Sequence, residues 1–313
     1  MTPTAADIRD AQRRIEGRVH RTPLEASSHL GENIYLKLEC WQRTRSFKVR
    51  GAFNAVASLS QEQRERGLVT ASAGNHGQAV ALAGREFHTR VTVFVPQDAP
   101  VTKKSRIAAL GARLDESAAH YDEAERLAVE YAENRGATFV HAYSDHAVVA
   151  GQGTVALEIL EELPTLRTVV VPVGGGGLVA GIGILLREVD PTIRVIGAQG
   201  EKTSAMHDAF RAGRVVDPVI EPTLADGLSG AVSESSYGLA KDVVDDIVLV
   251  SEDSIAQAIR ALYNLDGVVA EGSAAVGVAA LMAGKVPVEG TTVVIITGGN
   301  IDASRLASLI LSA

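Results

Sequence analysis

The chain has 313 residues, of which 46% are hydrophobic, so it can bury a sizeable core and is neither disordered nor collagen-like. Its formal net charge of −8 at pH 7 argues against a nucleic-acid or membrane partner, because both require a positively charged surface. Cys40 is the only cysteine, which excludes an intrachain disulfide and a cysteine-cluster metal site and predicts a buried thiol at the end of a strand. The N-terminus has no apolar signal core, so we expect a cytoplasmic protein.

Short β-rich runs alternate with helical patterns along most of the chain. Strands are predicted over residues 34–38, 68–71, 91–95, 138–140, 169–173, 193–198 and 293–297. Helices are predicted over residues 53–59, 77–84, 103–110, 122–133, 154–160, 178–187, 254–265, 274–281 and 303–311. This alternation is typical of an α/β fold with parallel sheets and helices on both faces, in which ligands bind at the carboxyl ends of the strands.

One long uncharged stretch could be mistaken for a membrane span. Nineteen residues between Arg167 and Arg187 carry no charge, which is close to the length of a transmembrane helix. The stretch contains Pro172 and six glycines, four of them consecutive, and such residues make a poor lipid-exposed helix. We therefore predict a buried strand, a glycine turn and a buried helix here.

The first candidate site is a lysine in the motif Ser46-Phe47-Lys48-Val49-Arg50-Gly51-Ala52, which follows a predicted strand and opens a helix. Apolar neighbours and the positive helix N-terminus both disfavour the ammonium form of Lys48. They lower its pKa and favour a nucleophilic amine. On position alone, an ordinary surface lysine remains the alternative.

The second candidate site is the loop Ser72-Ala73-Gly74-Asn75-His76-Gly77 between a strand and a helix. Small residues allow backbone N–H groups to converge on an anion, and the helix dipole adds to the attraction. A substrate carboxylate or a phosphate would suit this loop, and Asn75 could donate to a ring oxygen. The alternative is a tight loop with a structural role, in which His76 is simply packed and hydrogen-bonded.

The third candidate site is four glycines in a row, Gly174-Gly175-Gly176-Gly177, between a buried strand and a helix. Such a junction makes a bowl of backbone amides for a phosphate dianion. It lacks the lysine and hydroxyl ending of a P-loop and the spacing of a dinucleotide fingerprint. Close packing of the glycines is the alternative.

The fourth candidate site is the end of the last predicted strand, Thr297-Gly298-Gly299-Asn300. Thr297 could present its hydroxyl to a heteroaromatic nitrogen at the carboxyl edge of the sheet. A plain turn is the alternative.

In this order, the four sites resemble the fold type II pyridoxal-phosphate (PLP) enzymes, and specifically the serine/threonine dehydratase and serine racemase family. The likeness runs from about Ile15 to the C-terminus and includes four further segments: Arg21-Thr22-Pro23-Leu24, Ala150-Gly151-Gln152-Gly153-Thr154, Ala225-Asp226-Gly227 and Glu271-Gly272-Ser273. It implies an α/β fold of two lobes, each with a mostly parallel twisted sheet flanked by helices. Residues 1–50 and 146–313 would form a large PLP-binding domain, and residues 51–145 a smaller substrate-loop domain.

The resemblance implies pyridoxal 5′-phosphate as the cofactor and assigns roles position by position. Lys48 would be the catalytic residue and hold the cofactor as a Schiff base, with Phe47 against the ring. Asn75 would bond the phenolic oxygen, and Thr297 would face the pyridine nitrogen. The phosphate would bind to a five-residue loop: Gly174, Gly175, Gly176, Gly177 and Leu178. The substrate carboxylate would bind to a second loop: Ser72, Ala73, Gly74, Asn75 and His76.

The family implies a lyase of amino-acid catabolism. It would remove water and then ammonia from a small β-hydroxy amino acid such as L-threonine or L-serine, giving a 2-oxo acid. Relatives are often dimers, so we expect a homodimer. The chain ends at Ala313, soon after the last predicted helix, so we expect no appended amino-acid-sensing domain and a degradative role.

Several alternatives stay open. The substrate could be 3-hydroxyaspartate, a phenylserine or a hydroxylated amino acid from osmolyte breakdown, and the reaction could be serine racemisation or β-replacement. Outside this class, the chain could be a nicotinamide-binding oxidoreductase or a catalytically silent PLP-binding regulatory protein.

Three departures from the family pattern bear on these alternatives. Racemases of the family carry a proton-transferring serine where this chain has Ala73, so dehydration is favoured. Relatives bind a divalent cation at positions that match Gln199, Thr203 and Ala205, which lack anionic oxygens, so no metal is predicted. Arg45 replaces a usual glycine, and it is either a solvated charge or a partner for a substrate carboxylate.

Overall fold

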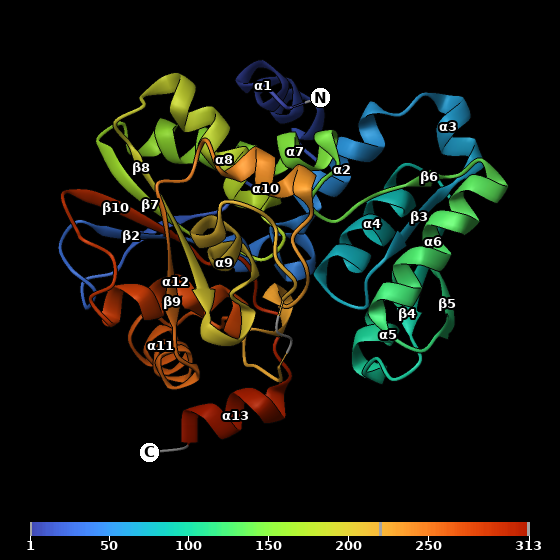
Figure 1. The fold of residues 1–313 in the computed structure, drawn as a ribbon. Helices are drawn as coiled ribbons and strands as arrows, with labels where there is room; N and C mark the ends of the chain where they lie inside the picture. The colour runs from blue at the N-terminus through green and yellow to red at the C-terminus, as the bar shows by residue number, and fades with distance from the viewer. Residues whose placement is uncertain (1, 219–220, 312–313) are drawn as a thin grey trace.

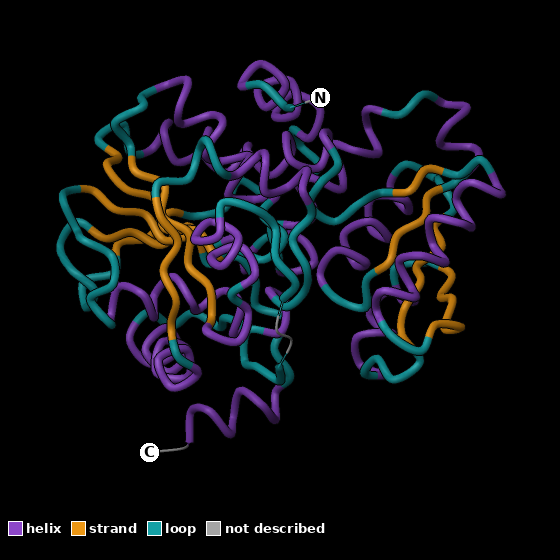
Figure 2. Tube along the Cα trace, in the orientation of Figure 1, coloured by secondary structure: helices purple, strands orange, loops and turns teal. Residues whose placement is uncertain are grey.

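The structure is a computed structural model in which residues 2–218 and 221–311 are described. These residues form two lobes that lie side by side, each built around its own sheet (Figure 1, Figure 2). The division into domains of residues 1–50 with 146–313 and of residues 51–145 stays a prediction. Its positions 1, 219–220 and 312–313 lie outside the described residues.

The strands and helices alternate along the described chain. The strands are β1 (Leu24–Ala26), β2 (Ile34–Lys37), β3 (Leu68–Ala71), β4 (Val91–Pro96), β5 (Arg113–Ala118), β6 (Thr138–Phe139), β7 (Leu166–Pro172), β8 (Arg194–Gly200), β9 (Asp246–Val250) and β10 (Thr291–Ile295). The α-helices are α1 (Ala5–Ile15), α2 (Lys48–Ser58), α3 (Gln61–Arg66), α4 (Asn75–Glu86), α5 (Val101–Ala109), α6 (Tyr121–Arg135), α7 (His146–Glu162), α8 (Gly177–Val189), α9 (Ala205–Ala212), α10 (Glu234–Ala240), α11 (Glu252–Leu265), α12 (Gly272–Met282) and α13 (Ala303–Leu311). Short 3₁₀ helices are η1 (Glu39–Trp41), η2 (Arg43–Arg45), η3 (Glu201–Thr203) and η4 (Asp226–Leu228).

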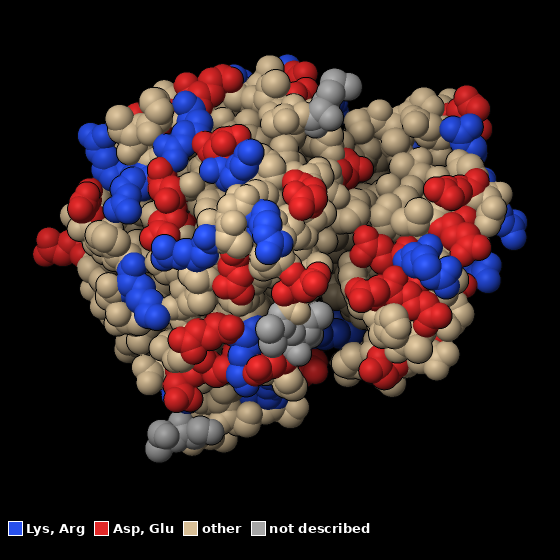
Figure 3. Space-filling model, in the orientation of Figure 1, with Lys and Arg blue, Asp and Glu red and all other residues tan. Residues whose placement is uncertain are grey.

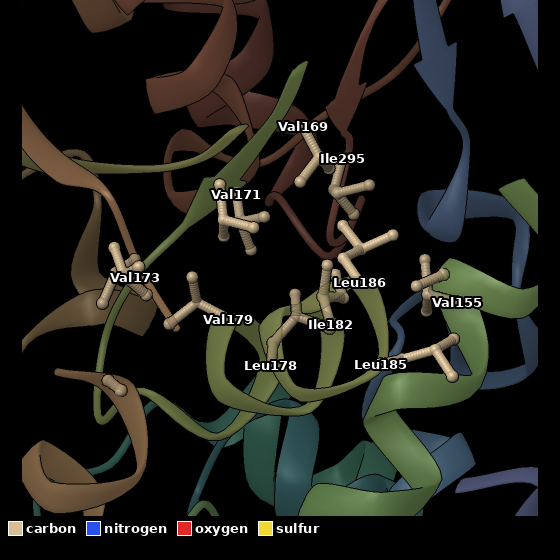
Figure 4. Close-up of a cluster of buried hydrophobic side chains, with 14 of the residues drawn as sticks. Val155, Val169, Val171, Val173, Leu178, Val179, Ile182, Leu185, Leu186 and Ile295 are labelled. Atoms are coloured by element: carbon tan, nitrogen blue, oxygen red, sulfur yellow. The ribbon is translucent and has the colours of Figure 1, made fainter. Parts of the chain in front are cut away.

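The sheet of the larger lobe has the strand order β1-β2-β10-β7-β8-β9, and only the β1–β2 pair is antiparallel. Successive residues of a strand point to opposite faces, and β7 is buried on both. Val169 and Val171 pack with Ile182 of α8, whereas Val170 packs with Val278 of α12. Figure 4 shows the first of these layers, in which α8 lies against β7 and β10.

The sheet of the smaller lobe has the order β5-β4-β3-β6, and all of its pairs are parallel. Val93 packs with Val80 of α4 on one face, whereas Phe94 packs with Ala128 of α6 on the other. The loop between the carboxyl end of β3 and the start of α4 contains the second candidate site. The site therefore lies at the carboxyl ends of the strands, where α/β folds bind ligands.

Each predicted strand and helix overlaps an observed element, but sequence reasoning missed β1, β5, β9, α1, α3, α9 and α10. The missed strands all lie at an edge of a sheet. An edge strand is buried less completely and need not be apolar, and β5 is largely polar and exposed. Cys40 is buried, as predicted, although it lies in η1 beyond the end of β2.

The uncharged stretch after Arg167 folds as predicted, into strand β7, a glycine turn and helix α8. No helix within residues 2–218 and 221–311 is long and apolar enough to cross a membrane.

Candidate active site

A cavity of about 280 Å³ lies between the two lobes, at the carboxyl ends of β3, β7 and β10. It is lined by segments from both lobes that are far apart in the sequence. Every residue predicted for the site lines this cavity: Phe47, Lys48, Ser72, Ala73, Gly74, Asn75, His76, Gly174, Gly175, Gly176, Gly177, Leu178 and Thr297. The structure therefore brings the four candidate sites together at the sheet edge where α/β folds bind ligands.

Lys48 is the first residue of α2, and its position is fixed from the end of β10. The Phe47 N–H donates to the carbonyl oxygen of Thr297 over 3.1 Å. The Lys48 Nζ donates to the carbonyl oxygen of Ala142 over 3.0 Å and lies 5.1 Å from the centroid of the Phe47 ring. Burial lowers the pKa of Lys48 to about 8, which makes its amine a better nucleophile and base near neutral pH.

A buried ion-pair network holds α2 at Arg50, two residues beyond Lys48. The Arg50 guanidinium donates to Glu39 and to Glu158 over 2.7 Å each, and the Lys37 Nζ donates to Glu158 over 2.6 Å. The side chains of Lys37, Glu39 and Arg50 are almost completely buried, and two cations balance two carboxylates. Removing one partner of such a network is costly, so it fixes the position of α2. Sequence reasoning missed this network because its residues come from four separate elements.

The four-glycine loop opens the N-terminus of α8 to the cavity. Gly176 precedes the helix with φ of +93°, a conformation that favours glycine, and no side chain caps the first amides. A Cβ added at Gly175 would collide with the Tyr143 ring, and one at Gly177 would lie 2.7 Å from the Tyr143 carbonyl oxygen. These glycines leave backbone N–H groups free to bind an anion such as a phosphate.

A second helix N-terminus, that of α4, faces the same cavity. Gly74 precedes the helix, no side chain caps it, and the Gly74 N–H donates to the Ser72 hydroxyl over 3.1 Å. The His76 Nε2 lies 3.0 Å from the carbonyl oxygen of Val140. Burial, aided by the nearby charge of Lys48, lowers the pKa of His76 to about 3, so its ring is neutral at physiological pH. His76 is thus a packed residue of the loop, and its pKa is too low for a general base.

Asn75 is held from both sides of its amide. Its Nδ2 donates to Glu271 over 2.8 Å, and its Oδ1 accepts a hydrogen bond from the Asn300 Nδ2 over 2.8 Å. Burial raises the pKa of Glu271 to about 7. Because an amide carries two N–H groups, one of them stays available on Asn75 for a ligand.

Three side chains that sequence reasoning missed also line the cavity: Tyr121, Tyr143 and Lys103. The Tyr143 hydroxyl donates to the carbonyl oxygen of Ala231 over 3.2 Å. The Lys103 Nζ forms an ion pair with Asp226 over 2.9 Å, which connects α5 of the smaller lobe to η4 of the larger lobe. No motif singled out the two tyrosines or the lysine, because each lies in an ordinary helical or loop pattern.

The positions that match a cation site in relatives are occupied differently here. The buried Gln199 Nε2 donates to the carbonyl oxygens of Val173 and Thr203 over 3.0 and 2.7 Å, and its Oε1 accepts from the His207 N–H over 2.8 Å. An amide offers no anionic oxygen to a divalent cation, and the Ala205 side chain offers no ligand. Across the described ranges, no group of three or more His, Cys, Asp or Glu side chains could hold a metal ion.

Arg45 lies outside the cavity. Its side chain is exposed and is not among the residues that line the cavity, which favours the solvated charge over a partner for a substrate carboxylate. Thr44 and Arg45 have φ values of 55° and 56°, which are strained for residues other than glycine.

Known proteins agree with this geometry. Residues 15–298 match the family described as "Pyridoxal-phosphate dependent enzyme". The chain belongs to this family. The chain is 45% identical to an L-threonine ammonia-lyase of Thermotoga maritima over 313 residues, which cover 98% of this chain and 78% of that protein. It is 39% identical to a catabolic L-threonine dehydratase of Staphylococcus aureus over 314 residues, covering 97% of this chain and 91% of that protein.

Solved structures show the same fold along nearly the whole chain. Serine racemase from maize matches with a TM-score of 0.94 at 32% identity, covering 98% of this chain and 97% of that one. Threonine deaminase isoform 2 from Solanum lycopersicum matches with a TM-score of 0.90 at 32% identity, covering 98% of this chain and 89% of that one. The α/β fold of type II PLP enzymes, predicted from the sequence, is therefore confirmed.

The chemistry of the cavity fits the cofactor of this family. The open amides at the start of α8 suit a phosphate, and the low-pKa amine of Lys48 suits an aldehyde. The buried hydroxyl of Thr297 and the oriented amide of Asn75 suit the nitrogen and the oxygen of a substituted pyridine ring.

Proposed function

We propose that this protein is a PLP-dependent ammonia-lyase that converts L-threonine or L-serine into a 2-oxo acid and ammonia. Relatives at 39–45% identity that bear threonine ammonia-lyase and dehydratase names support this reaction. The observation that carries it is the Lys48 amine, which lies in one cavity with two uncapped helix N-termini and whose pKa is lowered by burial. Two anions, one on the cofactor and one on the substrate, require two such sites.

In this proposal the larger lobe would hold most of the cofactor. Lys48 would bind its aldehyde carbon, and Phe47 would lie against its ring. Thr297 would bond its ring nitrogen, and Asn75 of the smaller lobe would bond its phenolic oxygen. The phosphate would bind to the amides of the glycine loop: Gly174, Gly175, Gly176, Gly177 and Leu178. When bound, the cofactor withdraws electrons from the Cα of the substrate, which makes the Cα proton acidic.

The smaller lobe positions the substrate. The loop of Ser72, Ala73, Gly74, Asn75 and His76 binds its carboxylate through backbone amides. The substrate amine would take the place of Lys48 on the cofactor, and the Lys48 amine freed in this way would remove the Cα proton, for which a pKa of about 8 is suitable. The β-hydroxyl would take up a proton and leave as water, and hydrolysis of the released enamine would give the 2-oxo acid and ammonia.

Serine racemisation is the second candidate, because serine racemases are among the similar structures. Racemisation needs a proton donor on the face of Cα opposite Lys48. Ala73 lines the cavity in the carboxylate-binding loop and cannot transfer a proton. Elimination is therefore the proposed reaction.

A substrate panel tests the proposal. The purified protein would be given L-threonine, L-serine, 3-hydroxyaspartate and phenylserine, with ammonia and 2-oxo acid measured together and the remaining amino acid analysed for chirality. We expect L-threonine and L-serine to react fastest and to stay in the L form. An Ala73→Ser variant should raise the D-serine yield relative to 2-oxo acid. D-serine production by the wild-type protein as fast as ammonia release would contradict the proposal.

We further propose that residues 1–50 and 146–313 act as the cofactor-binding domain and residues 51–145 as the substrate-loop domain. The ion pair of Lys103 with Asp226, which crosses between them at the cavity, supports this division. A cytoplasmic homodimer that acts in amino-acid degradation, without a nucleic-acid or membrane partner, completes the proposal. The net charge of −8 and the names of the bacterial relatives support it.

A further inference from the structure

A second large cavity lies in the smaller lobe, away from the candidate active site. Its volume is about 590 Å³, and it lies at the amino ends of β3, β4 and β5. Leu68 at the start of β3 lines this cavity, whereas Ser72, just past the end of β3, lines the active-site cavity. A four-residue strand separates the two by about 13 Å. The cavities are therefore distinct and lie at opposite edges of one sheet.

Four arginines line this second cavity: Arg66, Arg90, Arg113 and Arg135. Adjacent backbone positions bring three of them together. A Cβ added at Gly136, next to Arg135, would lie 3.4 Å from the Arg66 side chain, and one added at Gly67, next to Arg66, would lie 3.9 Å from the Arg90 side chain. Arg113 is the first residue of β5 and is paired in register with Thr92 of β4, which also lines the cavity.

These arginines are only partly neutralised by the protein. Arg66 pairs with Glu62 over 3.0 Å. Arg90 donates to the backbone carbonyl oxygen of Glu65, and Arg135 lies over the Tyr131 ring. The Glu65 carboxylate accepts a hydrogen bond from Gln61 instead of from an arginine. Arg113 has no carboxylate partner within residues 2–218 and 221–311.

The formal charge of this cavity is opposite in sign to the net charge of the chain. Four arginines and two glutamates give the cavity a formal charge of +2, in a chain whose net charge is −8. Arg66 and Arg135 end α3 and α6, where the helix dipole favours a cation. Arg90 immediately precedes β4 and Arg113 begins β5, so neither has a helix dipole to favour its charge at this cavity. Like charges that share a concavity repel each other unless an anion lies between them.

We propose that this cavity binds a small phosphorylated molecule. Guanidinium groups form paired hydrogen bonds with phosphate oxygens, and several arginines around one cavity suit a ligand with more than one phosphate charge. A nucleic acid fits less well, because acidic side chains gather over the neighbouring helix α6 on the face shown in Figure 3.

Calorimetric titration of the cofactor-loaded protein tests this site, because the bound cofactor then fills the phosphate loop of the active site. The probes are pyrophosphate, a sugar bisphosphate, inorganic phosphate, citrate and a short RNA, all at one low ionic strength. We expect saturable binding of pyrophosphate or of the sugar bisphosphate, tighter than that of inorganic phosphate. Absence of saturable binding, or tighter binding of citrate or of RNA, would overturn the proposal.

Matched variants assign the binding to this cavity. The variant Arg113→Ala/Arg135→Ala should weaken pyrophosphate binding about tenfold or more. The control Arg211→Ala/Arg214→Ala removes the same charge from exposed positions in and just after α9 and should change binding less than about twofold. Equal weakening by both variants would mean that net charge, and not this cavity, attracts the probe. Neither variant touches the candidate active site, so its ammonia-lyase activity reports separately on folding.

Discussion

The two helix N-termini that face the active-site cavity differ in what surrounds them. The loop before α8 consists of glycines whose missing side chains are replaced by neighbours: Tyr143 packs at Gly175 and Gly177, Met206 at Gly176 and Leu228 at Gly174. The loop before α4 carries side chains, and a Cβ added at Gly74 would have only the Ser72 hydroxyl within 4 Å, at 3.9 Å. The glycine loop before α8 is therefore closely packed by its neighbours, whereas the loop before α4 has space around Gly74.

This difference suits the two ligands proposed for the loops: the cofactor would stay bound before α8, and the substrate would bind and leave before α4. A cofactor phosphate keeps one shape through every turnover, so its site can be packed tightly from behind. A substrate carboxylate must enter and leave, and the loop proposed to bind it lies in the lobe joined to the other by the ion pair of Lys103 with Asp226. Lys48 and both loops line the same cavity, so substitutions at Lys48 and in the loops separate the roles of the two sites.

The largest effect is expected from Lys48→Ala, which removes the amine that both sites serve. Turnover should fall by about 10³-fold or more, and the visible absorbance of the bound cofactor should disappear. Lys285→Ala is the control, because Lys285 is exposed and lies outside the cavity. An active, yellow Lys48→Ala protein would refute the assignment of this residue.

The protonation of Lys48 should also be abnormal. Burial lowers its pKa from 10.5 to about 8, so its amine should react with an amine-selective reagent in the cofactor-free protein with a midpoint near pH 8. The native lysine loses its proton at lower pH than the unfolded one, so this group makes the protein more stable as pH rises from about 8 to 10.5. Site-resolved mass spectrometry measures the labelling, and a midpoint like that of surface lysines would contradict the burial argument.

We expect Gln199 to support the glycine loop before α8, because its amide donates a hydrogen bond to the carbonyl oxygen of Val173, the residue before Gly174. Gln199→Leu removes the hydrogen bonds that its amide makes to two buried carbonyl oxygens and to the half-buried His207 N–H, and it should lower the free energy of unfolding by about 3 kcal/mol. Gln97→Leu, at an exposed position, should change it little. Denaturant titration measures both. Because Gln199, Thr203 and Ala205 offer no anionic oxygen to a cation, EDTA should not change activity or stability, and a large loss in EDTA would contradict this account.

Gly177→Ala and Gly74→Ala compare the two loops directly. The first places a Cβ 2.7 Å from the Tyr143 carbonyl oxygen, and this overpacking should weaken cofactor binding about tenfold. The second has room and should change cofactor affinity less than about twofold. Affinity would be measured by titrating cofactor into the cofactor-free protein. Equal losses in the two variants would mean that the loops do not differ as described.

The smallest effect is expected from Arg45→Gly. Glycine relieves the strain of the φ of 56° and should raise the free energy of unfolding by about 1 kcal/mol. Arg211→Gly within α9 should instead lower it by about 1 kcal/mol. Substrate ranking should stay unchanged, because Arg45 does not line the cavity. A changed ranking would restore Arg45 as a specificity residue.

Much of the fold and of the candidate site could be predicted from local pattern. Strands buried on both faces, such as β7 and β10, are continuous apolar runs, and the glycines after β7 mark a close approach of backbone that few other arrangements require. Edge strands such as β5 were not predicted, because a strand that is buried on fewer sides has no regular pattern of apolar residues. The roles of the site residues stay predictions that the experiments above can test.

The sequence by itself determined the α/β class, and it predicted the amine at the start of α2 and two loops suited to an anion, because each depends on neighbours along the chain. Only the tertiary structure decided that Arg50 lies between Glu39 and Glu158, that Arg45 faces solvent, and that four arginines share a cavity. These facts depend on which distant segments meet. Burial and charge pairing arise from contacts between distant segments, and no local sequence pattern encodes those contacts.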